Sequence, residues 1–326
     1  MRKIMSSLDI GYASIKFIVA EIKGKKLYVL TSSIINNDAV KKDMTIDYDI
    51  LEAIIKKLLS DAKEKLGIEI KKTLLTIPTD SASFTINRAR IDIKNEDNLI
   101  TTDDMIKVVN LSGENVVQDN MELVNITPLY YTLDDSSKTD IPVNTFSRSL
   151  EVKSIITSSR KEDVYKYLRV LDNLGVSVVD ISYDVVGNYF AFKTDDMDTT
   201  CGVIIDIGYL STSISVYNKG VLVNTLKIKV GSLNVLKDIS YIYKISLESA
   251  KEVYRKLGLG SSKNANNLEK IELKDNNGDK LIINQVNLSE IIESRVNEIL
   301  SMAKKQINTL TKRQISYIIC TGGIAN

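Results

Sequence analysis

One short phrase occurs twice in this chain of 326 residues, and both copies have the pattern of a strand, a tight turn and a second strand. The copies are SLDIGYASIK at residues 7–16 and VIIDIGYLSTSI at residues 203–214. An aspartate at a strand tip can hold Mg²⁺ through the ion's water shell, and the glycine lets successive backbone N–H groups face phosphate oxygens. The repeat therefore predicts two similar halves that close around one nucleotide.

The composition is that of an ordinary soluble protein, with 44% apolar and 26% charged residues, and the length suffices for two domains. A net charge of +1 gives no reason to expect a nucleic-acid partner. Histidine is absent, which excludes histidine-based catalysis and nearly all zinc sites. Neither an apolar run of membrane-spanning length nor a signal peptide occurs, so we expect a cytoplasmic protein in which Cys201 and Cys320 are reduced and buried.

The first half predicts an α/β unit with an insertion. Strand patterns at 4–10, 15–22 and 27–35 precede an amphipathic helix at 49–66 and a short strand at 74–78. Asp49 and Glu52 predict the cap of that helix, and Gly67 predicts its end. A helix at 102–109 and strands at 121–132 and 148–157 predict a small α+β insertion, after which a helix at 160–174 and a strand at 176–183 complete the unit.

The second half repeats the order. Strands at 201–207, 213–218 and 221–230 follow a linking helix at 184–192. We then expect a helix at 246–257, a flexible polar loop at 259–268 and a hairpin that turns at Asn276-Asn277-Gly278. The last helix, at 288–310, is expected to be capped by Asn287 with Glu290, and a final strand at 315–320 runs into Thr321-Gly322-Gly323.

Small residues extend the candidate site beyond the two aspartates. Ser14 and Thr212 would add hydroxyl donors to the two turns, and the turn Val230-Gly231-Ser232 follows the second hairpin. The glycines at 322 and 323 would let a flat base approach the backbone. One such hairpin alone is more often an ordinary turn with a solvated aspartate, so the inference depends on the two copies and on their order.

The order of first phosphate loop, second phosphate loop and adenosine loop resembles that of the actin/Hsp70/sugar-kinase superfamily. The resemblance implies an α/β fold of the actin-like (ribonuclease H-like) type, with two domains and an inserted small α+β subdomain. The implied boundaries are 1–83 and 161–195 for the first domain (1A), 84–160 for the insertion (1C), 196–232 and 303–326 for the second domain (2A), and 233–302 for its small subdomain (2B).

Within this superfamily, the chain resembles the bacterial cell-division family FtsA most strongly, over essentially its whole length. The similarity is carried by the segment 41–47 that leads into the predicted helix, by the place of the insertion at 84–160, by residues 164–176, and by residues 291–300 with Arg295 and Glu298. It implies an actin-like protein that binds ATP and Mg²⁺, assembles into protofilaments and links the FtsZ ring to the membrane at the division site. The FtsZ C-terminal tail would dock on 233–302 and other divisome proteins on 84–160.

The resemblance also implies the nucleotide contacts of this chain. Asp9 and Asp206 would hold the metal through water, and Asp206 is the candidate catalytic residue. The cofactor-binding residues implied by the family pattern are Asp9, Gly11, Tyr12, Ala13, Ser14, Lys16, Asp206, Gly208, Ser211, Thr212, Gly231, Ser232, Glu252, Gly322 and Gly323.

The sequence departs from the family pattern at the second loop. The family usually has Asp-Ile-Gly-Gly-Gly-Thr-Thr-Asp, whereas here Tyr209 and Leu210 replace two glycines and Ser213 replaces the closing aspartate. Side chains there would be disfavoured by a positive φ or would crowd the phosphate, which predicts weak phosphate binding and poor hydrolysis. Tyr254 stands at the family's lysine position in the adenosine helix. The sequence stops at Asn326, where the family continues to a membrane helix, which predicts a cut chain or a loss of direct tethering.

Two other functions fit the same residues. In an active ATPase, Asp206 would position the attacking water and would hold Mg²⁺ together with Asp9, but the altered second loop argues against turnover. A PilM-type pilus-assembly protein would share the extra subdomain and bind a peptide of a membrane partner, whereas the segment 41–47 and the helix with Arg295 favour the division protein. We therefore expect a scaffold with a weakly bound or structural nucleotide rather than an enzyme.

Overall fold

The computed structural model describes the whole chain except residues 1–2, 25, 41–44, 79–81, 96 and 324–326. The chain forms two compact units, Met1–Gly187 and Asn188–Asn326, and each is described by itself. Part of the segment 41–47 and the end of the chain at Asn326, both used in the sequence comparison, lie outside the described residues.

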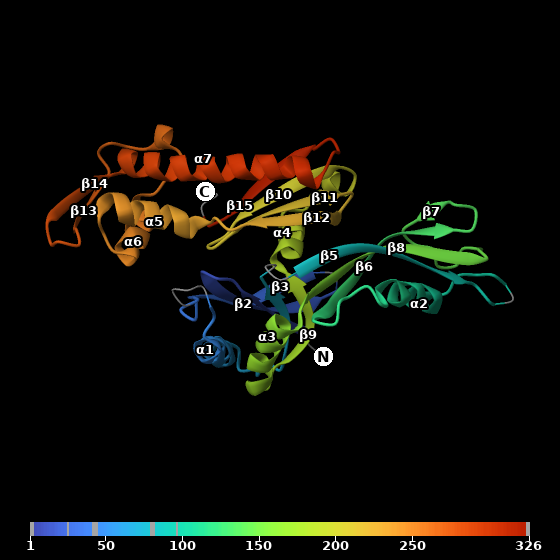
Figure 1. The fold of residues 1–326 in the computed structure, drawn as a ribbon. Helices are drawn as coiled ribbons and strands as arrows, with labels where there is room; N and C mark the ends of the chain where they lie inside the picture. Colours follow the sequence, from blue (N-terminus) through green and yellow to red (C-terminus); the bar gives the residue numbers. More distant parts are fainter. Residues whose placement is uncertain (1–2, 25, 41–44, 79–81, 96, 324–326) are drawn as a thin grey trace. The chain divides into compact units, whose positions relative to one another are not determined.

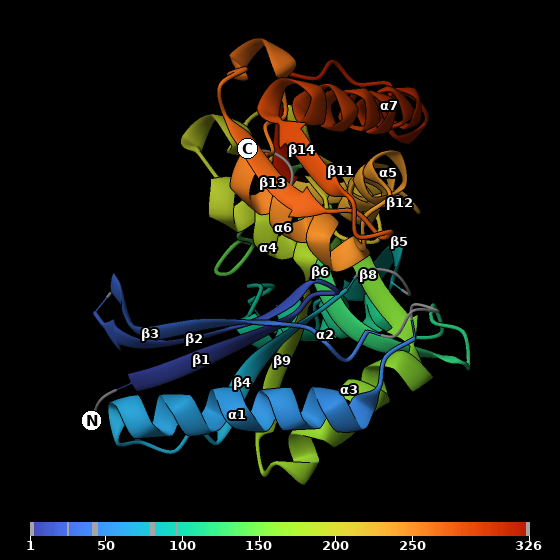
Figure 2. The same ribbon diagram turned by 90° about the vertical axis from the view of Figure 1, so that its left-hand side faces the viewer.

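The first unit is built on a five-stranded sheet in the order β3-β2-β1-β4-β9 (Figure 1). Its strands are β1 (Lys3–Ile10), β2 (Ser14–Lys23), β3 (Lys26–Asn36), β4 (Lys72–Ile77) and β9 (Ser177–Tyr183). The first three strands are antiparallel neighbours, whereas β4 runs parallel to both β1 and β9. Figure 2 shows α1 (Tyr48–Leu66) running along one face of this sheet, with α3 (Lys161–Asn173) on the same side.

The structure confirms the helix predicted at 49–66 and corrects its cap. Leu51, Ile55, Leu58 and Ala62 recur at helical spacing and are buried, so the stripe read from the sequence faces the sheet. The N-cap is Asp47 rather than Asp49, because the Asp47 carboxylate accepts hydrogen bonds from the first free backbone N–H groups of the helix. Gly67 ends the helix in a left-handed conformation, as predicted.

The insertion forms a sheet and a small core of its own. The strands β5 (Ala82–Asp92), β6 (Met121–Leu133), β7 (Lys138–Thr139) and β8 (Ser149–Arg160) lie in the order β5-β8-β6-β7. The helix α2 (Thr102–Gly113) packs on one face of this sheet, as Figure 1 shows, and Val108, Tyr131 and Val152 belong to the core between them. The strand β5 was not predicted, because its mixture of apolar, polar and charged residues is not a clear strand pattern by itself. Its pairing with β8 along its whole length forms the strand.

The second unit repeats the topology of the first. Its sheet has the order β12-β11-β10-β15, built from β10 (Cys201–Ile207), β11 (Thr212–Asn218), β12 (Val221–Ile228) and β15 (Tyr317–Gly322). The pairs β10–β11 and β11–β12 are antiparallel and β15 runs parallel to β10, as β4 does to β1. The repeated phrase therefore marks a repeated fold, which confirms the predicted two-unit α/β architecture.

Three helices and a hairpin complete the second unit. They are α5 (Ser232–Tyr243), α6 (Leu247–Leu257), the hairpin β13 (Lys270–Lys274) with β14 (Lys280–Asn284), and α7 (Gln285–Leu310), while α4 (Asp184–Phe192) links the two units. One core joins the sheet to α5, α6 and α7; it contains Val203, Ile239, Val253, Ile299 and Ala303. The hairpin turns at Gly278 as predicted.

Four details of the second unit differ from the sequence reading. The helix α5 was not predicted, and the cap of α7 is Asn284 rather than Asn287. The loop at 259–268 is not free, since Glu293 of α7 accepts hydrogen bonds from both the backbone N–H and the hydroxyl of Ser262, at 2.8 and 2.7 Å. Cys201 is buried as expected, but Cys320 is exposed because β15 is the edge strand of its sheet.

Candidate functional site

The first hairpin turn is a compact loop closed by its own backbone. The N–H of Gly11 donates to the carbonyl of Ser14 at 3.1 Å, and Asp9 lies directly opposite Lys16 across the two strands. The Lys16 ammonium contacts the Asp9 carboxylate at 2.8 Å, and both side chains are partly exposed. The structure therefore brings together the predicted residues of the first loop, with one cation already beside the aspartate.

Asn37 holds this turn from the end of β3, a role the sequence analysis missed. Its side-chain amide donates to the Gly11 carbonyl at 2.7 Å, and its backbone N–H donates to the Ala13 carbonyl at 3.0 Å. Asn37 is buried, so two of the turn's carbonyls are bonded inside the unit. An asparagine that directly follows a strand is the signal that could have pointed to it.

The second hairpin turn has the same backbone geometry. The N–H of Gly208 donates to the carbonyl of Ser211 at 3.0 Å, which matches the closing bond of the first turn. Asp206 lies opposite Ser213 across the two strands, at the place where Asp9 of the first hairpin has Lys16. Asn188 of α4 instead donates from its side-chain amide to the Asp206 carboxylate at 2.9 Å. Asn188 is thus a second site residue that the sequence did not reveal.

The backbone of the second loop accommodates its two large residues. Neither Tyr209 nor Leu210, both in the described part of the chain, adopts a positive φ. The expectation that backbone strain weakens this loop is therefore wrong, and crowding by the side chains is the remaining physical reason for weak phosphate binding. Burial raises the pKa of the Tyr209 phenol above its ordinary value.

Gly231 fixes the start of α5 against the second loop. The N–H groups of Ser232 and Leu233 donate to the carbonyls of Gly208 and Tyr209, at 2.8 and 2.9 Å. These helix-terminal donors, which could otherwise face an anion, are thus bonded to the loop itself. A Cβ on Gly231 would lie 2.6 Å from each of the two loop carbonyl oxygens, so only glycine allows this approach.

The Thr212 side chain lies inside the unit and does not face the surface of the loop. Its side chain is fully buried, and its hydroxyl donates to the Val230 carbonyl at 2.8 Å. This corrects the expectation that Thr212 adds a donor for phosphate, because the hydroxyl is already engaged where the strand β12 ends. Ser211, one position earlier in the chain, is only half-buried.

The predicted adenosine turn lies beside the second loop. Gly322 has a φ of +106°, and a Cβ there would come within 2.2 Å of the Ile207 carbonyl oxygen. Gly323 donates its N–H to the same carbonyl at 3.2 Å. Tyr254 of α6 reaches this turn, with its hydroxyl 3.3 Å from the Gly323 carbonyl oxygen. Close backbone packing therefore requires glycine at 322, independently of any base, whereas a Cβ on Gly323 would meet no atom within 4 Å.

Glu252, the other predicted adenosine contact, is paired on the surface of α6. Its carboxylate contacts the Lys256 ammonium one turn later at 2.6 Å, and both side chains are mostly exposed. Within the described residues, no group of three carboxylates or thiols that could directly enclose a metal ion occurs. The two loop aspartates, Asp9 and Asp206, therefore fit a metal ion that is held through its water shell. They do not fit a metal ion that is coordinated directly by several protein ligands.

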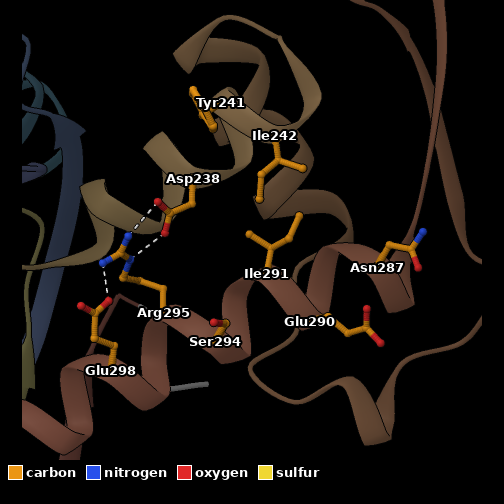
Figure 3. A pocket seen from close by; sticks show the side chains of 9 residues that line it. All are labelled: Asp238, Tyr241, Ile242, Asn287, Glu290, Ile291, Ser294, Arg295 and Glu298. Atoms are coloured by element: carbon orange, nitrogen blue, oxygen red, sulfur yellow. Dashed lines mark hydrogen bonds and ion pairs between the residues drawn. The ribbon is translucent and has the colours of Figure 1, made fainter.

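A groove lies between α5 and α7 in the second unit (Figure 3). It has a volume of about 520 Å³, and Arg295 of α7 crosses it to Asp238 of α5 with two hydrogen bonds of 2.6 and 2.8 Å. Arg295 also pairs with Glu298, and these carboxylates raise the pKa of its guanidinium. Tyr241, 85% exposed, and Ile242 add apolar side chains to the α5 side.

Comparison with known proteins agrees with this architecture. The family model of the cell division protein FtsA matches residues 203–319. The FtsA protein of Bacillus subtilis (strain 168) is 25% identical over 321 residues, which cover 98% of this chain and 73% of that protein. The solved PilM-PilN type IV pilus biogenesis complex contains a chain with a TM-score of 0.67 at 13% identity, covering 98% of this chain and 81% of that one. MreB5 of Spiroplasma citri, solved with ADP, has a TM-score of 0.56 at 14% identity, covering 98% and 85%.

The duplicated sheet topology and the similarity to these solved structures define an actin-like fold, in which each unit carries one Asp-Ile-Gly hairpin. Sequence relatives that extend along nearly the whole chain include FtsA proteins of Bacillus subtilis and Staphylococcus epidermidis. The chain is similar to these proteins along nearly its whole length, and the FtsA family model matches within its second unit. Among the described residues, no helix has both the length and the apolar character needed to cross a membrane.

Proposed function

We propose that the chain is an actin-like cell-division scaffold that binds an adenine nucleotide weakly or structurally. The observation that carries the proposal is the Asp-Ile-Gly hairpin present in each unit, in a chain whose relatives are cell division proteins. Protofilament formation is part of the same proposal, since the fold is shared with MreB and the relatives are FtsA proteins. Its place of action would be the inner face of the cell membrane at the division site.

Weak nucleotide binding follows from how the second loop is used. The N-terminal amides of α5 are bonded to the loop carbonyls, the hydroxyl of Thr212 is buried, and Tyr209 and Leu210 fill the place of glycines. Mg²⁺ would neutralise phosphate charge when bound, held through water by Asp9 and Asp206. Lys16 and Asn188 keep these two carboxylates in place.

Titration calorimetry with ATP and Mg²⁺ tests this part of the proposal. We expect weak binding and no turnover above background. ATP hydrolysis at the rate of an actin-like enzyme, abolished by Asp206→Ala, would instead establish the active ATPase that remains the alternative for this site.

The groove between α5 and α7 is the proposed docking place of the FtsZ C-terminal tail. Its α5 side carries the exposed Tyr241 and Ile242, which suit an apolar anchor. Its lining contains three carboxylates, Asp238, Glu290 and Glu298, against the single guanidinium of Arg295. This balance favours a tail segment whose apolar anchor is flanked by cationic residues.

A pair of matched variants tests the docking place. Tyr241→Ala removes an exposed ring without breaking a hydrogen bond of the structure, and Leu268→Ala removes an apolar side chain that is 83% exposed and lies outside the groove. In fluorescence anisotropy with a labelled FtsZ tail peptide, we expect Tyr241→Ala to weaken binding about tenfold, or about 1.4 kcal/mol. Equal effects of the two variants, or no binding by the parent protein, would contradict the proposal.

A pilus-assembly role is the second candidate, since the fold is similar to a chain of the PilM-PilN complex with a TM-score of 0.67. Binding of a PilN peptide by a protein that fails to bind the FtsZ tail would favour it. The sequence relatives favour cell division, because proteins named FtsA match 98% of this chain at up to 25% identity.

A further inference from the structure

The sheet of the inserted subdomain has one face covered by α2 and another that carries charged side chains. On the covered face, Leu150 and Val152 of β8 are buried in the core. Residues alternate between the faces of a sheet, so Glu151 and Lys153 project to the opposite side. The register places Arg88 of β5 beside Lys153, and Tyr130 of β6 beside Lys153 on its other flank.

Cations and one aromatic ring form a continuous row across this face. The ammonium groups of Lys138 and Lys153 lie 4.5 and 5.7 Å from the centre of the Tyr130 ring. Arg88 completes the row on β5 and is more than half exposed. Neighbouring strands are about 4.8 Å apart, so Arg88, Lys153 and Tyr130 together span about 10 Å, the reach of three or four extended residues. We call Arg88, Lys138, Lys153 and Tyr130 the basic row.

The acidic groups near the basic row only partly neutralise it. Glu151 contacts one Nη of Arg88 at 3.3 Å, which leaves the remaining donors of that guanidinium for another acceptor. Arg90 adds a further cation on the same face and donates to the Ser149 hydroxyl at 2.8 Å. Asp92 lies at the far end of β5, while Asp134 at the β6–β7 turn accepts the backbone N–H of Arg148. The face therefore concentrates positive charge in a chain whose net charge is only +1.

We propose that the basic row is a docking surface for an acidic peptide segment of a partner protein. Arginine binds carboxylates through its planar fork, and the two lysines hold the Tyr130 ring as a flat contact for a peptide backbone. An extended acidic segment carries negative charges along one line. These charges would face the cations of the basic row, which crosses adjacent strands in a line. The inference rests on the proposed function, in which the segment 84–160 receives other division proteins, and it names the surface and the chemistry of the partner.

Charge reversal on the basic row tests the proposal on the full chain. The probes are fluorescein-labelled hexaglutamate and hexalysine, followed by anisotropy at low and at moderate salt. We expect hexaglutamate to bind and hexalysine not to bind, and salt to weaken the binding because the row is exposed. Arg88→Glu/Lys153→Glu should weaken hexaglutamate binding at least about tenfold, since two attractions become repulsions, and the neutral pair Arg88→Gln/Lys153→Gln about threefold.

The control variant is Lys107→Glu/Lys304→Glu, which changes the net charge equally at exposed positions of α2 and α7. It should retain hexaglutamate binding, and every variant should keep the parent's circular dichroism spectrum. Retained binding of the FtsZ tail by Arg88→Glu/Lys153→Glu would show that the proposed function stands whatever the basic row binds. Equal losses in the row and control variants would overturn the proposal. The proposal would also be overturned if the basic row bound phosphatidylglycerol vesicles in preference to hexaglutamate, because the ligand would then be a lipid surface. Self-association that depends on the basic row would overturn it as well, because the ligand would then be a second copy of this chain.

Discussion

Gly231→Ala is the substitution that most directly tests how the second loop is held. A Cβ at this position would lie 2.6 Å from the carbonyl oxygens of Gly208 and Tyr209, about 0.8 Å short of the 3.4 Å at which ordinary contacts begin. If α5 withdraws by that distance, the 2.8 Å bond from Ser232 to Gly208 lengthens beyond a hydrogen bond, as does the 2.9 Å bond from Leu233 to Tyr209. Two lost hydrogen bonds at about 1 kcal/mol each, with the strain of overpacking, destabilise the second unit by about 3 kcal/mol.

Urea unfolding followed by far-UV circular dichroism measures this effect, since the chain has no tryptophan for fluorescence. Gly187→Ala is the matched control: Gly187 lies inside α4, and a Cβ there would meet no atom within 4 Å. The control should be stabilised by about 0.5–1 kcal/mol, because alanine favours a helix over glycine. A Gly231→Ala protein as stable as the parent would refute the claim that backbone contact between α5 and the loop holds this site.

Three further predictions follow from the same unit. Tyr209→Gly/Leu210→Gly should tighten ATP binding in titration calorimetry by about tenfold if crowding limits the site, and unchanged affinity would exclude crowding. Tyr254→Phe should lower stability by about 1 kcal/mol and speed hydrogen exchange of the turn at 321–323, whereas unchanged exchange would mean that the phenol does not hold the turn. Glu293→Gln should speed hydrogen exchange at Ser262 at neutral pH, because it removes the carboxylate that accepts the Ser262 hydrogen bonds. These hydrogen bonds lower the pKa of Glu293 in the folded protein. In the parent protein they should therefore be intact above the ordinary glutamate pKa of about 4.3 and be lost only as the pH falls through the lower folded pKa. A tether that opens at or above the ordinary value would contradict that assignment.

The repeated architecture could be predicted from the sequence, whereas the residues that support the two turns could not. The hairpins could be predicted because each needs only local information: apolar alternation, an aspartate and a glycine within a dozen residues. Asn37 and Asn188 could not be placed, because each contacts its turn only after the chain has folded back from another element. The tether from Glu293 to Ser262 was missed for the same reason, and a fixed loop was predicted to be flexible.

The sequence by itself determined the class of fold, since two copies of one strand–turn–strand phrase with matching elements after each specify a duplicated α/β unit. Only the tertiary structure decided what the residues of the second loop do. It showed that Tyr209 and Leu210 do not adopt a positive φ, that the Thr212 hydroxyl is bonded inside the unit, and that Gly231 is needed for packing. The physical reason is that φ angles and hydrogen-bond partners depend on the helix α5 and the strand β12, whose approach to the loop no local pattern records.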